Sequence, residues 1–335
     1  MVILYLIIIQ DSLVEMGIVF LSLKRYDDAL DVLNEALDLR EREVSTSSDT
    51  KKQLLVAKIL NNIGCVYYEY GDMRAARKTL NEALKIQEEI LGSNDPTSEP
   101  GLLSMASTMC NVGYVYLERR KFDDAIVMFE EALSIQEEVL GGDNTLVIHT
   151  MDNLAYALSH DANYDGAMKI YVEILESQRE MQQQIVSGER DRQQHSHHES
   201  SATSSDTAGV AIDIANTLKK MAFIHLKLYQ YDEALNLLSK ILKIQQKYHK
   251  FIHEREIYNT EKMINGVNYH ILKFHSPTEA VIMSLTSQGI QNPFTNRALD
   301  FSFMGKVEDE LDCRAYAIVK PKNTSKVSGH KITYA

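Results

Sequence analysis

The fold is decided by residues 60–92, LNNIGCVYYEYGDMRAARKTLNEALKIQEEILG. Apolar and small side chains recur in this stretch at helical spacing, first over Leu60–Tyr67 and again over Ala76–Leu84. Between the two runs, Tyr70-Gly71-Asp72 breaks the pattern, and glycine next to aspartate is typical of a turn. The stretch therefore predicts two helices joined by a short turn.

Copies of the end of this stretch recur along the chain. Residues 34–44 read NEALDLREREV, residues 81–91 read NEALKIQEEIL and residues 130–140 read EEALSIQEEVL, with weaker copies at 172–182 and 240–250. Internal repetition at this period is typical of proteins made of stacked supersecondary units. A single helix pair cannot bury its apolar face alone, so neighbouring pairs must stack.

Each copy has a small residue on its first helix and an alanine twelve positions later. The pairs are Gly17 and Ala29, Gly64 and Ala76, Gly113 and Ala125, Ala155 and Ala167, and Ala222 and Ala234. Small side chains at fixed heights let two helices approach closely, so an insertion inside a unit would break the packing. The spacing between units varies, because surface loops tolerate extra residues. We therefore assign these ten residues to helix crossings.

The repeat register divides the chain into four segments. Residues 1–184 are expected to form four helix pairs, and residues 210–290 a fifth pair followed by a degenerate sixth that caps the array. Residues 185–209 are polar and of low complexity, which predicts a disordered insertion. Residues 291–335 lose the pattern and are expected to form an irregular tail. The predicted fold class is all-α: an α-solenoid, coiled as a right-handed superhelix of five to six pairs.

The composition limits which kinds of partner and which cellular compartment are expected. A net charge of −12 argues against a surface that grips phosphate backbones, so no nucleic-acid partner is expected. Three cysteines without paired spacing fit a reducing compartment and predict a cytoplasmic protein. The opening MVILYLIIIQ (residues 1–10) is too short to span a bilayer and lacks the features of a signal peptide, so no membrane partner is expected. It is either the start of a buried helix or the beginning of a truncated copy.

The order of small, aromatic and apolar residues resembles the tetratricopeptide repeat. The longer unit here, with LNN-I-G at Leu60–Gly64 and IQEE-I-LG at Ile86–Gly92, is similar to the repeats of kinesin light chain. The resemblance implies a scaffold that binds a protein or peptide in the concave groove of the solenoid. Kinesin light chains also carry an N-terminal heptad coiled coil that joins the motor. No heptad run precedes residue 10, so association with a motor stays open.

Three asparagines stand two positions before the small residue of their repeats: Asn62, Asn111 and Asn153. Asparagine inside a helix costs roughly 0.5 kcal/mol relative to alanine, so its recurrence suggests a compensating use. A side-chain amide both donates and accepts hydrogen bonds, and can therefore hold the backbone of an extended peptide. The resemblance implies that equivalent asparagines contact cargo peptides. The alternative is that each asparagine bonds a neighbouring helix.

Two aromatic and four charged residues are predicted to extend the same wall: Tyr114, Tyr156, Glu69, Glu118, Lys219 and Lys220. The tyrosines either form pockets for side chains of a bound peptide or belong to the core. The acidic residues at one end and the basic residues at the other either orient a ligand by charge or form a solvated face.

No catalytic signature such as GxGxxG, HExxH or GxSxG occurs, and we expect neither enzymatic activity nor a cofactor. His195, His197 and His198 lie in a serine-rich tract without rigid geometry, so no metal site is predicted. The chain is expected to be an adaptor with a peptide-binding groove. The alternative is a structural subunit held in a larger assembly through the convex face of the solenoid.

Overall fold

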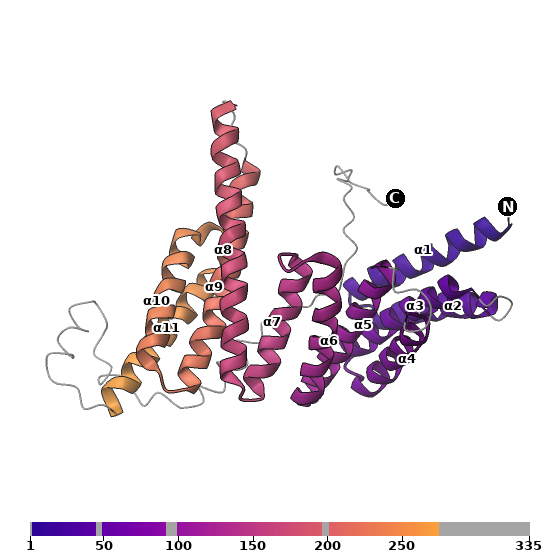
Figure 1. Ribbon diagram of the computed structural model, residues 1–335, viewed down its shortest axis with the longest axis horizontal. Helices are drawn as coiled ribbons and strands as arrows, with labels where there is room; N and C mark the ends of the chain where they lie inside the picture. Colours follow the sequence, from indigo (N-terminus) through magenta and orange to yellow (C-terminus); the bar gives the residue numbers. More distant parts are fainter. Residues whose placement is uncertain (1, 45–48, 92–98, 196–200, 275–335) are drawn as a thin grey trace, which may run out of the picture. The chain divides into compact units, whose positions relative to one another are not determined.

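The computed structural model describes residues 2–44, 49–91, 99–195 and 201–274. Over these ranges the chain is helical and contains no strand (Figure 1). The helices are α1 (Val2–Ser22), α2 (Tyr26–Val44), α3 (Thr50–Tyr70), α4 (Met73–Leu91), α5 (Glu99–Glu118), α6 (Phe122–Leu140), α7 (Thr145–His160), α8 (Tyr164–His195), α9 (Ser201–Lys227), α10 (Tyr231–Lys247), the 3₁₀ helix η1 (His249–Phe251) and α11 (Glu254–Phe274). The predicted all-α solenoid class is confirmed.

The described residues fall into two compact units, divided between Val115 and Tyr116. In the first unit, α1 packs on α2, α2 on α3 and α3 on α4. The second unit repeats this arrangement from α6 to α11. The odd-numbered helices α1 to α9 begin the five predicted pairs, and α11 lies where the first helix of the degenerate sixth pair was expected.

The ten small residues assigned to helix crossings are all buried. The seven alanines among them have no exposed surface. A Cβ atom added to Gly17 would lie 2.5 Å from Cγ of Leu33, and one added to Gly64 would lie 2.5 Å from Cγ of Leu80. Both distances are shorter than real Cβ contacts, so the absence of a side chain sets how closely the helices of these pairs approach.

The turns inside the pairs share one backbone conformation. Five residues, each seven positions after the small residue of its repeat, have φ between 55° and 94°: Lys24, Gly71, Arg120, Ala162 and Tyr229. In every case the next backbone N–H donates to the carbonyl five residues earlier, at 2.8–2.9 Å. This bond closes a left-handed helix end of the Schellman type. Only the second repeat has glycine there, the residue that adopts this conformation without strain.

A polar side chain is buried on the second helix of every pair, 23 positions after the small residue: Arg40, Gln87, Gln136, Gln178 and Gln245. Two of these side chains bond the first helix of the next repeat. Nε2 of Gln87 donates to Oγ of Ser104 at 3.2 Å, and Oε1 of Gln178 accepts from Oγ1 of Thr217 at 3.0 Å. These contacts fasten neighbouring repeats within each unit.

The structure differs from the sequence prediction between residues 185 and 209. Helix α8 continues to His195 and α9 begins at Ser201, so helix covers most of the stretch that was expected to be disordered. Glutamate, arginine and glutamine are good helix formers, and extending an existing helix avoids the cost of nucleation. The predicted second helix of the sixth pair and the tail 291–335 lie outside the described residues.

Candidate peptide-binding site

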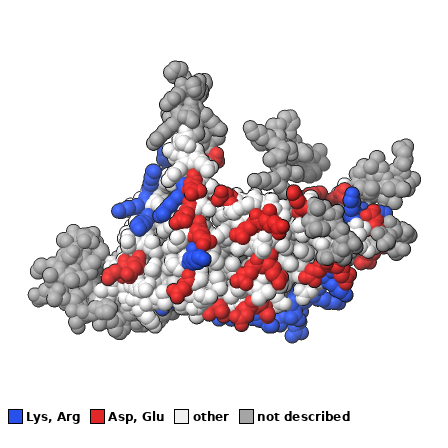
Figure 2. Space-filling view, in the orientation of Figure 1, with Lys and Arg blue, Asp and Glu red and all other residues white. Residues whose placement is uncertain are grey.

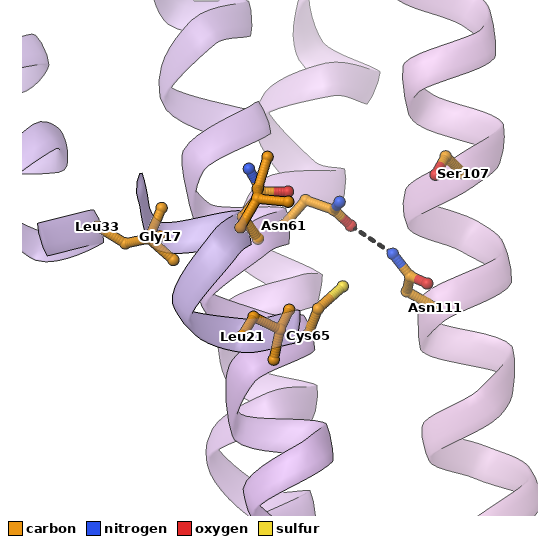
Figure 3. Close-up of a pocket in the computed structure, with 9 residues that line it drawn as sticks. Gly17, Leu21, Leu33, Asn61, Cys65, Ser107 and Asn111 are labelled. Carbon is orange, nitrogen blue, oxygen red and sulfur yellow. Dashed lines mark hydrogen bonds between the residues drawn. The ribbon is translucent and has the colours of Figure 1, made fainter. Parts of the chain in front are cut away.

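A pocket opens between the first helices of the first three repeats, inside the first unit (Figure 3). Its volume is about 50 Å³. The lining residues are Gly17, Ile18 and Leu21 of α1, Leu33 of α2, Asn61, Asn62 and Cys65 of α3, and Ser107 and Asn111 of α5. Three of the nine are side-chain amides and none carries a formal charge. Two of the three predicted asparagines, Asn62 and Asn111, thus lie at one site.

Asn111 is held by the neighbouring repeat. Its Nδ2 donates to Oδ1 of Asn61 at 2.9 Å, across the gap between α5 and α3 (Figure 3). This is the structural role that the sequence left as the alternative for the asparagines. An amide has two donor hydrogens and two acceptor lone pairs, so Asn111 keeps further bonding capacity on the pocket side.

Asn62 is in a different situation. Its Nδ2 is buried from solvent and has no hydrogen-bond partner among the described residues. A buried donor without an acceptor costs roughly 1–3 kcal/mol, and native proteins keep few of them. An acceptor brought into the pocket by a ligand would remove this cost.

The sequence explains why Asn62 has no partner. Asn61 stands three positions before the small residue of its repeat, and Asn111 stands two positions before the small residue of the next repeat. The side chains at these two positions bond each other across the repeats. We call such a contact a joint. In the first repeat the position of Asn61 is occupied by Val14, whose side chain packs into the apolar cluster of the first unit. Valine offers no acceptor, so the joint to Asn62 is not formed.

The second unit contains a charged joint at the same two positions. Nζ of Lys220 on α9 lies 2.6 and 2.7 Å from the carboxylate oxygens of Asp152 on α7. The side chains are only 12% and 15% exposed. Lys220, predicted as a cation that attracts a ligand, is therefore already paired within the protein.

Burial raises the pKa of titratable groups near both joints. It raises the pKa of the Cys65 thiol to about 12, with a further contribution from Glu69, so this pocket residue stays a neutral thiol at physiological pH. In the second unit, burial and then the charge of Asp152 raise the pKa of Tyr171. Burial also raises the pKa of Asp213, although His149 and Lys220 oppose the shift.

The remaining predicted groove residues are distributed over both units. In the first unit, Tyr114 is buried with its ring 6.5 Å from that of Tyr68, and Glu69 is half-buried. Four belong to the second unit: Asn153, which is buried, and Tyr156, Glu118 and Lys219, which are half-buried. Tyr156 stacks on His160 at 4.1 Å between ring centroids.

The sequence did not predict the roles of three residues at this site. Asn61 and Ser107 line the pocket, and Val14 leaves Asn62 without an acceptor. A usable signal was present, because Asn61 with Asn111 and Asp152 with Lys220 are complementary pairs at equivalent positions of consecutive repeats. Finding it required comparing one position with a different position in the next repeat.

The lining of the pocket is uncharged, whereas much of the protein surface is acidic (Figure 2). Acidic side chains spread widely over the face shown in Figure 2, in line with the net charge of −12. Among the described residues, no group of three or more His, Cys, Asp or Glu side chains is placed to hold a metal ion. No helix in the described part of the chain is long and apolar enough to cross a membrane.

Comparison with known proteins supports the repeat assignment. The family model for the tetratricopeptide repeat matches residues 10–89 and 104–180. No curated protein sequence matches the chain.

Several solved structures share the fold. The chain is similar to BtubC (BKLC) from P. vanneervenii, at 15% identity and a TM-score of 0.51, covering 92% of this chain and 98% of that one. It is also similar to a putative kinesin light chain from Podosopora anserina with nearly identical TPR-like repeats, at 15% identity and a TM-score of 0.51, covering 71% and 95%. Aspartyl phosphate phosphatase F from Bacillus subtilis gives 14% identity and a TM-score of 0.54, covering 99% and 75%. At such identities the likeness shows the fold alone.

Proposed function

Because residues 10–89 and 104–180 belong to the tetratricopeptide repeat family, a scaffold for protein–protein interaction, we propose that this chain is an adaptor that binds an extended segment of a partner protein between α1, α3 and α5. The adaptor is non-catalytic and needs no cofactor. We place it in the cytoplasm, and three cysteines without paired spacing support a reducing compartment.

The buried, unsatisfied Nδ2 of Asn62 carries this proposal. A backbone carbonyl of an extended segment is an acceptor that every peptide offers, whatever its sequence. Asn61 and Asn111, already bonded to each other, position their remaining amide atoms beside it. The arrangement fits main-chain recognition.

The apolar part of the pocket suggests which side chain accompanies that carbonyl. Ile18, Leu21 and the neutral thiol of Cys65 line it, and its volume of about 50 Å³ is small. A small uncharged side chain fits this space, because a charged group would be desolvated without a counter-charge. We therefore propose a partner segment with a small neutral residue at the anchor position.

The alternative, a structural subunit held through the convex face that the second helices are expected to form, has less support. Among the described residues of those helices, the exposed large apolar side chains are Val127 on α6 and Val172 on α8. Single exposed valines are ordinary on protein surfaces.

The test is a screen of extended peptides followed by calorimetric titration of the hits. Asn62→Ala should weaken binding by roughly tenfold or more, because the ligand carbonyl loses its donor. The unliganded variant should melt at the same temperature as the wild type or higher, since a buried unsatisfied group is removed.

Asn81 supplies the matched control. It is an exposed asparagine on α4, away from the pocket, so Asn81→Ala should leave peptide affinity unchanged. Hits that bind Asn62→Ala as tightly as the wild type would exclude the pocket as the binding site.

A further inference from the structure

Helix α1 carries an apolar stripe that no described residue covers. Met16, Val19 and Leu23, at or just beyond the C-terminal end of α1, are 45%, 53% and 61% exposed. Their spacing of three and four residues places them on one face of the helix. The opposite face of α1 packs on α2, with a smaller contact to α3.

The same positions are buried in the other first helices. One position before the small residue lie Ile63, Val112, Leu154 and Met221, and two positions after it lie Val66, Val115, Ala157 and Ile224. All eight are less than a tenth exposed. In α3, α7 and α9 the preceding second helix packs on the first helix, through the contacts of α2 with α3, α6 with α7 and α8 with α9. The stripe on α1 is thus a helix-packing surface that lacks its helix within the described residues.

Two exposed charges of opposite sign lie beside the stripe. Glu15 lies next to Met16, and Lys24 follows Leu23; both are exposed, and neither forms an ion pair within the described structure. In an antiparallel pair of α1 helices centred near Val19, Met16 of each copy comes within a turn of Leu23 of the other. The same arrangement brings Glu15 within a turn of Lys24 of the other copy.

We propose that two copies of this chain associate through the α1 stripe, with their helices antiparallel about a two-fold axis. One arrangement satisfies both the apolar residues and the charges, as a self-complementary contact requires. A parallel pair would instead bring the two Glu15 side chains together and the two Lys24 side chains together. Met16, Val19 and Leu23 are not among the residues that line the peptide pocket.

Two measurements on the full chain test this contact: light scattering coupled to size-exclusion chromatography, and sedimentation equilibrium. We expect the measured mass to reach twice the 38.1 kDa of one chain as the protein concentration is raised to about 100 µM. Val19→Asp should raise the dissociation constant of the dimer roughly tenfold or more, because it buries a carboxylate at the centre of the contact. Val127→Asp is the matched control, since Val127 is 48% exposed on α6.

A charge exchange tests the antiparallel register. Glu15→Lys alone should weaken the dimer, and the double variant with Lys24→Glu should restore it. Circular dichroism of each variant verifies that helicity is kept.

Three outcomes overturn the proposal: a monomer throughout the concentration range, equal weakening by Val127→Asp, or no recovery in the double variant. A monomer that binds phosphatidylcholine vesicles through α1 would assign the stripe to lipid instead.

Discussion

Adjacent alanines on α4 show how sharply single positions are constrained. Ala76 has no exposed surface and lies at the helix crossing, whereas Ala75 is only half-buried. Both residues are equally good helix formers, so local propensity does not separate them. Packing against the neighbouring helix does, because close-packed interiors leave no room for an added side chain.

We predict that Ala76→Arg lowers the free energy of unfolding by about 3 kcal/mol or more, because it forces a long charged side chain into a closed crossing. Urea denaturation followed by circular dichroism measures the loss. Ala75→Arg is the matched control and should cost less than about 1 kcal/mol, since a half-buried arginine can extend its head group into water. Equal losses for the two variants would show that the assigned crossing is wrong.

At the scale of the helix pair, the turn decides where one helix ends and the next begins. All five turns adopt the same left-handed closure, but the sequence marks only one of them with glycine, at Gly71. The residue that follows the left-handed position, just before the second helix, also differs from turn to turn. Asp72 caps α4, and its Oδ1 accepts from the backbone N–H groups of Arg74 and Ala75 at 3.1 and 3.0 Å. Gln230, at the equivalent position before α10, makes no such bond.

Asp72→Ala should therefore lower the free energy of unfolding by about 1 kcal/mol, the usual contribution of a helix N-cap. Gln230→Ala, at the equivalent turn, should change it by less than about 0.5 kcal/mol. Thermal denaturation of both variants beside the wild type gives the comparison. A loss at Gln230 as large as that at Asp72 would contradict the capping explanation.

The joints connect one pair to the next, and their chemistry is not uniform over the molecule. The joint between α3 and α5 is a neutral amide pair, whereas that between α7 and α9 is an ion pair that is largely shielded from water. Salt weakens an ion pair that is shielded from water only a little. Removing one of its two charges lowers the stability of the protein, because the remaining charge loses its partner.

We predict that Asp152→Leu and Lys220→Leu each lower the free energy of unfolding by about 2 kcal/mol, and that the double variant loses at least about 1 kcal/mol less than their sum. A double-mutant cycle from urea denaturation measures this coupling. The exposed pair of Arg25 and Asp28 is the control, and Asp28→Ala should cost less than about 0.5 kcal/mol. Additive losses at Asp152 and Lys220 would argue against the joint.

Over the whole chain, the sequence predicted what depends on spacing inside a repeat. The small residues, the paired helices and the turns between them follow from fixed offsets, because each is set by local periodicity. The helical continuation through residues 185–195 was not predicted, since polar composition was given more weight than helix propensity.

The candidate site was predicted only in part. Asn62 and Asn111 were expected to act alike, yet one is bonded to the next repeat and the other has a free donor. The difference depends on which residues of consecutive repeats face each other, and spacing within one repeat does not reveal that. The buried glutamines of the second helices were missed for the same reason.

The valine at position 14 has a consequence for how such a protein could change its role. An acidic or amide side chain there would supply the acceptor that Asn62 lacks, and the opening would become one more internal brace. A change at this one codon would therefore convert the proposed binding pocket into an internal contact between repeats. The helical array could gain or lose a binding site in this way without a change of fold.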